Sequence, residues 1–82
     1  MLEKLKEAKQ KVAGARQTIR ALENNLALVV YIARDAEEKV INPVLRLCEQ
    51  GNVPVHYVDS MEQLGKACKI KVGAAVAAIT EK

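Results

Sequence analysis

Arg16, Gln17 and Arg20 are the side chains with the clearest chemical potential, because they follow Gly14 at the start of a helical pattern. Cations in the first turn of a helix oppose its dipole at a cost of about 0.3–1 kcal/mol, and an i, i+4 arginine pair adds repulsion. A phosphate or an electronegative base edge reverses this balance, since free N–H groups, the dipole and two guanidinium groups all attract it. Glycine also lets a ligand approach the backbone closely. The pattern predicts an anion- or base-recognition site, with a solvated helix face as the alternative.

Residues that often act in catalysis are present without the partners they need. His56 is the only histidine, and no nucleophile can be placed beside it from the sequence. Asp35, Glu37 and Glu38 are expected to cap and charge the first turn of a following helix rather than to form a ligand site. No P-loop or dinucleotide-binding glycine motif occurs. We therefore predict that the protein is not an enzyme and uses no cofactor.

The two cysteines do not indicate a metal site. Cys48 and Cys68 are too far apart for a Cys-x-x-Cys pair and lack the further ligands of a zinc site. Both lie among apolar neighbours in helical patterns, so we expect them to be buried as small hydrophobic residues.

The net charge of +3 is unevenly distributed along the 82 residues. Through Arg20 there are six basic and two acidic residues, a balance of +4, whereas seven basic and eight acidic residues after it give −1. A second, smaller basic group follows at Lys66, Lys69 and Lys71. Clustered cations indicate a polyanionic partner, although a solvated helix face has the same composition.

Length and composition indicate one globular domain over residues 1–82 with a single modest core. The only aromatic residues are Tyr31 and Tyr57, so this core must consist mainly of aliphatic side chains. No apolar segment approaches the roughly 18 residues that span a bilayer, and the charged N-terminus lacks the apolar stretch of a secretory signal. We expect a cytoplasmic protein without a membrane partner.

Hydrophobic spacing predicts helices and strands that alternate along the chain. One helix face is marked by Leu2, Leu5, Ala8 and Val12, and a second by Ala15, Ile19, Leu22 and Leu26. Strands are predicted at 26–33, 53–58 and 74–79, with a short extended piece at 11–13. A further helix is expected to start at Asn42 and Pro43 and to end at Gly51, and Ser60 with Gln63 caps another over 61–69. This alternation predicts an α/β fold with a mixed or mostly parallel sheet between helices.

Three segments carry a family resemblance: "GARQTIRAL", "VVYIARDA" and "VPVHYVDSMEQLGKACKIKVGAAVAAI". They resemble the kink-turn RNA-binding ribosomal-protein family of the L7Ae and L30e type, especially its small stand-alone bacterial members. The most specific parts are the Gly-x-x-Gln-x-x-basic element from Gly14 to Arg20 and the Leu-Gly-x-Ala pattern from Leu64 to Ala67.

This resemblance implies a three-layer α-β-α sandwich with a mixed sheet of about four strands. It also implies binding to a sharply bent RNA helix at tandem sheared G·A pairs, with Arg16, Gln17 and Arg20 reading the pairs and nearby phosphates. The loop at 69–73 would cover an extruded nucleotide, with apolar contacts from Ile70 and Val72. The implied RNA-binding residues are Gly14, Ala15, Arg16, Gln17, Arg20, Arg34, Ile70, Lys71, Val72 and Gly73.

The chain departs from the family pattern at two places. Archaeal members have Asn-Glu where this chain has Arg16 and Gln17, and Lys69 stands where a glycine is common. Ile70 and Val72 also have an alternative place, packed under the adjacent helix. Ordinary A-form RNA hides its major groove from side chains, so the implied binding mode requires a distorted helix.

The sequence thus predicts a monomeric RNA-binding protein that stabilises kink-turns in a structured RNA such as ribosomal RNA, a riboswitch or a leader RNA. The alternative is a protein-interaction or ribosome-assembly domain of the same fold whose basic face is incidental.

Overall fold

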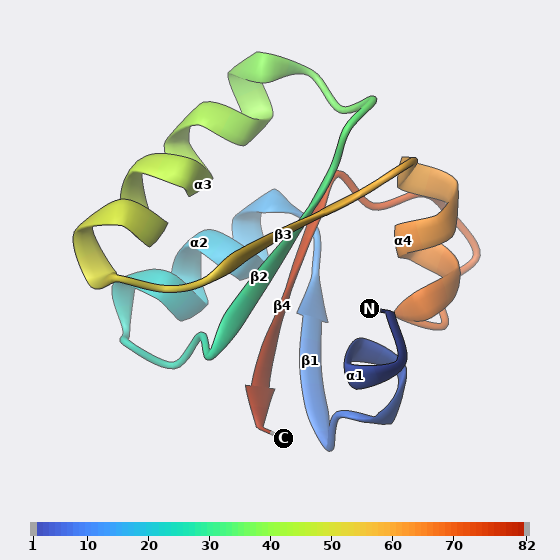
Figure 1. Ribbon diagram of the computed structural model, residues 1–82, viewed down its shortest axis with the longest axis horizontal. Coiled ribbons are helices and arrows are strands. Elements are labelled where there is room, and N and C mark those ends of the chain that lie inside the picture. Colours follow the sequence, from blue (N-terminus) through green and yellow to red (C-terminus); the bar gives the residue numbers. More distant parts are fainter. Residues whose placement is uncertain (1, 82) are drawn as a thin grey trace.

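The computed structural model describes residues 2–81, which form four helices and four strands (Figure 1). In chain order these are α1 (Leu2–Glu7), β1 (Gln10–Ala13), α2 (Ala15–Glu23), β2 (Val29–Ala33), α3 (Glu38–Gly51), β3 (Val55–Val58), α4 (Met61–Ala67) and β4 (Val76–Glu81). The strands form one sheet in the order β1-β4-β2-β3. β2 is parallel to β3 and antiparallel to β4, while β1 is antiparallel to β4, so the sheet is mixed as predicted.

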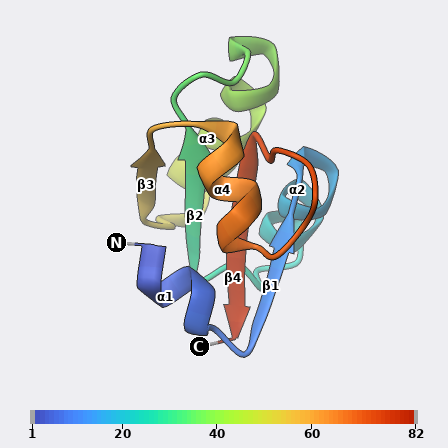
Figure 2. The ribbon, with the colours of Figure 1, turned by 90° about the vertical axis from the view of Figure 1, so that its right-hand side faces the viewer.

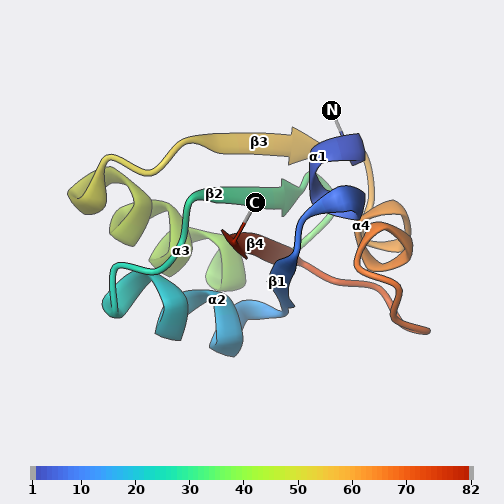
Figure 3. The same cartoon turned by 90° about the horizontal axis from the view of Figure 1, so that it is seen from below.

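Helices cover both faces of this sheet. α2 and α3 lie on one face and the shorter α1 and α4 lie on the other (Figures 2 and 3). A hydrophobic core lies between the sheet and the helices on each face. Successive side chains of a strand point to opposite faces, so the apolar run of β2 contributes to both of these cores. All five of its residues are buried. Val30 and Ile32 pack in the α2/α3 layer, whereas Val29, Tyr31 and Ala33 pack in the α1/α4 layer. The expected three-layer sandwich and its covered central strand are confirmed.

The predicted start of the third helix at Asn42 and Pro43 is wrong. α3 begins at Glu38, with Glu37 at the N-cap position, and Pro43 lies inside it. Proline in a helix deprives the carbonyl four residues earlier of its partner, here that of Lys39. Both Pro43 and Lys39 are exposed, so water can bind this carbonyl. The stability gained by burying the apolar face of α3, which includes Val44, therefore outweighs the cost of the proline.

Other boundaries also shift. Val12 lies in β1 instead of on the first helix face, and Leu26 belongs to neither the helix nor the strand predicted for it. Asn25 adopts a φ of 59° and ends α2 before Leu26, which is 57% exposed. β3 and β4 begin two residues later than predicted, at Val55 and Val76, and α4 ends at Ala67.

Candidate nucleic-acid interface

Three of the segments singled out in the sequence meet at one end of the sheet. The N–H of Gly14, just before α2, donates to the carbonyl of Val76 at 2.8 Å. The N–H of Ala33, at the end of β2, donates to the carbonyl of Ala75 at 2.9 Å. Arg34 follows β2 directly. The 69–73 loop leads into the start of β4, which accepts these two hydrogen bonds (Figure 2). Pairing within the sheet therefore brings the start of α2, Arg34 and this loop to the same end of the sheet.

The start of α2 is open toward solvent. Gly14 has a φ of 94°, a conformation that side chains disfavour, and the space where its Cβ would lie is empty to 4 Å. Its carbonyl accepts the N–H of Thr18 at 3.0 Å, but no side chain among the described residues caps the helix. The first N–H groups of α2 thus keep their capacity to bind an acceptor.

The cationic side chains of α2 project away from the core. Arg16, Gln17 and Arg20 are exposed, whereas Thr18, Ala21 and Leu22 of the same helix are buried. Within residues 2–81, neither arginine side chain forms an ion pair or a hydrogen bond with the protein. These guanidinium groups therefore keep all their donors available for a ligand.

The 69–73 loop is tied to α4 at both ends. After α4, the N–H of Ile70 donates to the Gly65 carbonyl at 3.1 Å, and that of Lys69 donates to the Lys66 carbonyl at 3.0 Å. This pair of bonds is a Schellman motif, and Lys69 supplies its left-handed residue with a φ of 62°. Lys69 thus takes a conformation that glycine adopts more readily.

The other end of the loop is equally close to the helix. The N–H of Ala74 donates to the Met61 carbonyl at 3.0 Å. A Cβ added to Gly65 would overlap the carbonyl oxygen of Val72. The backbone of the loop therefore lies directly on α4 and is held in one shape. Its apolar side chains point outward instead of packing under the helix, with Ile70 37% and Val72 69% exposed.

Arg34 has a partner that the sequence analysis missed. Its guanidinium carbon lies 5.3 Å from the centroid of the Tyr57 ring, within the range of a cation–π contact. Alternation within β3 places Tyr57 on the same face as Val55 and gives no sign of its exposure, and its pairing with Arg34 depends on the parallel register of β2 and β3.

The remaining candidate residues do not assemble a reactive site. His56 is exposed on β3, with its ring centroid 5.6 Å from that of Tyr31. Asp35 accepts the N–H of Met61 at 2.8 Å, so it caps α4 rather than the helix that follows it, which corrects the prediction for this residue. Glu38 does lie in the first turn of α3, whereas Glu37 makes no capping bond there.

The cysteines behave as core thiols. Cys48 is buried and Cys68 partly buried. Burial raises the pKa of both thiols, although the Lys11 ammonium partly offsets this for Cys68. Across residues 2–81, no group of three or more His, Cys, Asp or Glu side chains is arranged to hold a metal ion. No helix in this part of the chain is long and apolar enough to cross a membrane.

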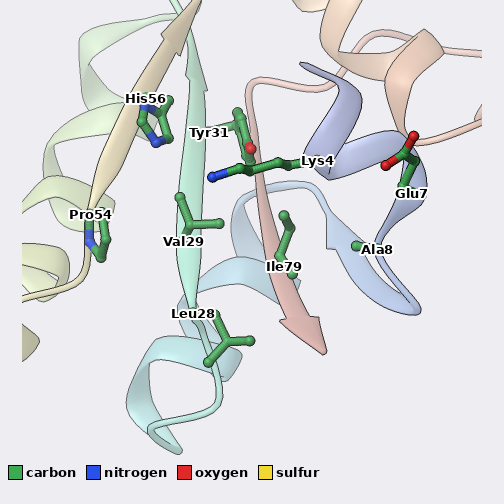
Figure 4. Close-up of a pocket in the computed structure, with 9 residues that line it drawn as sticks. All are labelled: Lys4, Glu7, Ala8, Leu28, Val29, Tyr31, Pro54, His56 and Ile79. Carbon is green, nitrogen blue, oxygen red and sulfur yellow. The ribbon is translucent and has the colours of Figure 1, made fainter. Parts of the chain in front are cut away.

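A pocket of about 470 Å³ lies at the opposite end of the sheet, between α1 and β3 (Figure 4). Its apolar part includes Val29, Tyr31 and Ile79, and Lys4 extends across it toward His56. The pocket shares no residue with the α2 start, Arg34 or the 69–73 loop. It is therefore a surface separate from these segments.

Fold and surface together define an α-β-α sandwich domain with a cationic, uncapped helix start. The chain matches the model of the "Ribosomal protein L7Ae/L30e/S12e/Gadd45 family" over residues 1–82, and it belongs to this family.

Several bacterial relatives are similar over nearly their whole length. RNA-binding protein YbxF of Geobacillus stearothermophilus is 51% identical over 77 residues, which cover 94% of each chain. An RNA-binding protein of Halalkalibacterium halodurans is 48% identical with the same coverage. A solved structure of a protein with unknown function from Bacillus halodurans has a TM-score of 0.83 at 24% identity, covering 98% of this chain and 80% of that one. This last likeness concerns the fold.

Proposed function

We propose that the protein binds RNA and recognises kink-turns, at the end of the sheet where α2 begins. The observation that carries this proposal is the start of α2, which has no side-chain cap within residues 2–81, together with Arg16 and Arg20, which are exposed and have no side-chain partner among these residues. Arg16 in the first turn opposes the helix dipole and repels Arg20 at i, i+4, although Arg20 itself lies in the last turn, so a bound anion is the physical reason for this pair. Family membership and relatives named RNA-binding proteins support RNA as that anion.

A bent RNA fits this surface better than a regular duplex does. The deep, narrow major groove of A-form RNA excludes a helix, whereas a kink widens it. The N-terminus of α2 then enters the groove, where its free N–H groups and the dipole attract phosphate. Arg16 and Arg20 suit the O6 and N7 of guanine, and Gln17 suits the N6 and N7 of adenine. A sheared G·A pair leaves the O6 and N7 of its guanine exposed, whereas the N6 and N7 of its adenine take part in the pair, so the two arginines have the better-matched edge.

The 69–73 loop forms a second contact beside the first. Ile70 and Val72 present apolar side chains to solvent, and Lys71 is exposed between them. An unstacked nucleotide at the bend would bury its base against these side chains. Because the loop is already held on α4, binding requires little additional ordering.

The action proposed is non-catalytic. Free RNA populates the bent state only in part, and a protein that binds this state alone shifts the population toward it. Such a module acts as a cytoplasmic monomer, and several RNAs with the same bend would serve as its partner.

The test is the affinity of variants for a kink-turn duplex at physiological salt. A triple substitution of Arg16→Gln, Gln17→Ala and Arg20→Gln should weaken binding by about a hundredfold or more, since it removes two charged contacts and one base contact. Its helix should be about as stable as before, because the loss of Arg16 relieves an unfavourable interaction with the dipole and the loss of Arg20 from the last turn removes a favourable one. Arg46→Gln, an exposed arginine of α3, is the matched control and should bind as the wild type does.

The pocket between α1 and β3 favours the second candidate, a protein-interaction or ribosome-assembly domain. Leu28 at its edge is 43% exposed and is continuous with the apolar lining formed by Val29 and Ile79, and contiguous apolar surface of this kind marks interaction sites. If the triple variant binds the duplex as tightly as the wild type, or if binding is insensitive to salt, RNA recognition by α2 is refuted in favour of this second candidate.

A further inference from the structure

Tyr57 and Arg34 form an exposed pair at the edge of the sheet. The Tyr57 side chain is 42% exposed although it is one of only two aromatic residues in the chain. The Arg34 guanidinium lies over its ring, 5.3 Å from the centroid. A stacked guanidinium keeps its N–H groups in its own plane, free to bind a ligand at the edge.

Strand register places this pair on the same side of the sheet as α2. Tyr57 is the partner of Ile32 in the parallel pairing of β2 and β3. Ile32 packs in the α2/α3 layer, so the register directs Tyr57 to that side, and Arg34 joins it through its contact with the Tyr57 ring. β3 is three strands away from β1, a separation of roughly 14 Å at ordinary strand spacing. The pair therefore lies across the end of the sheet from the start of α2.

Carboxylates surround Arg34, yet its guanidinium contacts an aromatic ring. Four exposed carboxylates come from the same end of β2 and β3, namely Asp35, Glu37, Glu38 and Asp59. Arg34 forms no ion pair with any of them, and within residues 2–81 its side chain has no hydrogen-bond partner. The ring of Tyr57, instead of a carboxylate, is the contact that orients the guanidinium.

We propose that Tyr57 is a positioning residue for Arg34, and that the pair extends the RNA-contacting surface to β3, where Arg34 binds a backbone phosphate. The inference rests on the proposed function. Guanidinium and phosphate form a bidentate pair, which needs the planar group held at a fixed angle. Stacking on Tyr57 supplies that angle and keeps the guanidinium from the neighbouring carboxylates.

The experiment measures affinity for the kink-turn duplex at several salt concentrations. Arg34→Gln should weaken binding about tenfold and reduce the slope of log Kd against log salt by about one. Tyr57→Ala should weaken binding about fivefold, whereas Tyr57→Phe, which keeps the ring, should bind as the wild type does. The double variant Arg34→Gln, Tyr57→Ala should bind no more weakly than Arg34→Gln alone, because Tyr57 acts through Arg34.

Wild-type binding by Tyr57→Ala, or an additive loss in the double variant, would overturn the inference. Circular dichroism confirms that each variant is folded, and Arg46→Gln serves as the charge control. If the wild-type protein fails to bind the duplex, the proposed function and this inference both fall. If it binds and only the α2 variants lose affinity, the inference about Tyr57 alone is refuted.

Discussion

At the scale of single residues, Lys69 has an unfavourable backbone conformation that a substitution can relieve. Its φ of 62° lies in the left-handed region, which is costly for most residues with a Cβ. Asn25 and Asn52 adopt the same region at the ends of α2 and α3, where asparagine tolerates it better.

Lys69→Gly should therefore raise the free energy of unfolding by about 1 kcal/mol. Urea denaturation measures this change directly. Lys71→Gly is the control, because Lys71 is exposed in the same loop without a positive φ. Equal or lower stability of Lys69→Gly would contradict this account of the loop.

Thr18 carries a buried hydroxyl group in α2. It is fully buried, and its Oγ1 has no hydrogen-bond partner within the described residues. Thr18→Val keeps the shape and removes the unpaired hydroxyl, so it should stabilise the protein by about 1 kcal/mol. Thr18→Ala leaves a cavity and should be less stable than Thr18→Val. A loss of stability in the valine variant, seen in thermal unfolding, would show that the hydroxyl is satisfied.

The exposed residues of α2 were predictable because helical spacing separates them from the apolar stripe along a single segment. Arg16, Gln17 and Arg20 are exposed as their positions between Ala15, Ile19 and Leu22 indicated. The pairing of Arg34 with Tyr57 was not predictable, since it joins two strands through a register that local spacing does not determine.

At the scale of elements, the contact between α4 and the 69–73 loop determines the shape of the second surface. Gly65 is buried in α4, and its missing Cβ makes room for the Val72 carbonyl. Gly65→Ala would force the loop away from the helix. We expect a loss of about 2 kcal/mol or more in stability, comparable to overpacking of a core.

The same substitution should weaken binding to the kink-turn duplex beyond any effect on folding. Isothermal titration at a temperature where the variant is folded separates the two effects. Ala67→Gly, in the same helix, is the control for helix stability, because it lowers stability without adding an atom near the loop. Unchanged affinity in Gly65→Ala would exclude the loop from the interface.

Boundaries of elements were less predictable than their existence. Each β-branched apolar run became a strand, but strand starts at Val29, Val55 and Val76 depend on pairing partners. The predicted helix start at Pro43 was wrong because the local preference of proline for a first helical position was outweighed by burial of one face of α3.

At the scale of the whole molecule, the cores on the two faces of the sheet each bury a group that can lose a proton, Cys48 in the α2/α3 layer and Tyr31 in the α1/α4 layer. Burial raises the pKa of the Cys48 thiol and of the Tyr31 hydroxyl above their ordinary values of 9.0 and 10.0. Between the ordinary and raised values, the unfolded chain has lost protons that the folded chain keeps. Stability is therefore complete below about pH 9 and falls as pH rises through the raised values.

Urea denaturation near neutral pH and at about pH 10.5 tests this expectation. The midpoint should be lower at the higher pH, and part of the dependence should disappear in Cys48→Ala. A midpoint that does not move with pH would contradict the assignment of these groups to the core.

Kink-turn recognition, as proposed above, requires that the protein bind the bent RNA and stabilise the bend. The most direct measurement is fluorescence energy transfer across a kink-turn duplex labelled at both ends, titrated with the protein at physiological salt. A second duplex, with its G·A pairs replaced by Watson–Crick pairs, is titrated in parallel. We predict tight binding and a rise in transfer for the first duplex alone. Equal, weak and salt-sensitive binding to both, without bending, would contradict kink-turn recognition and leave only a generic basic surface.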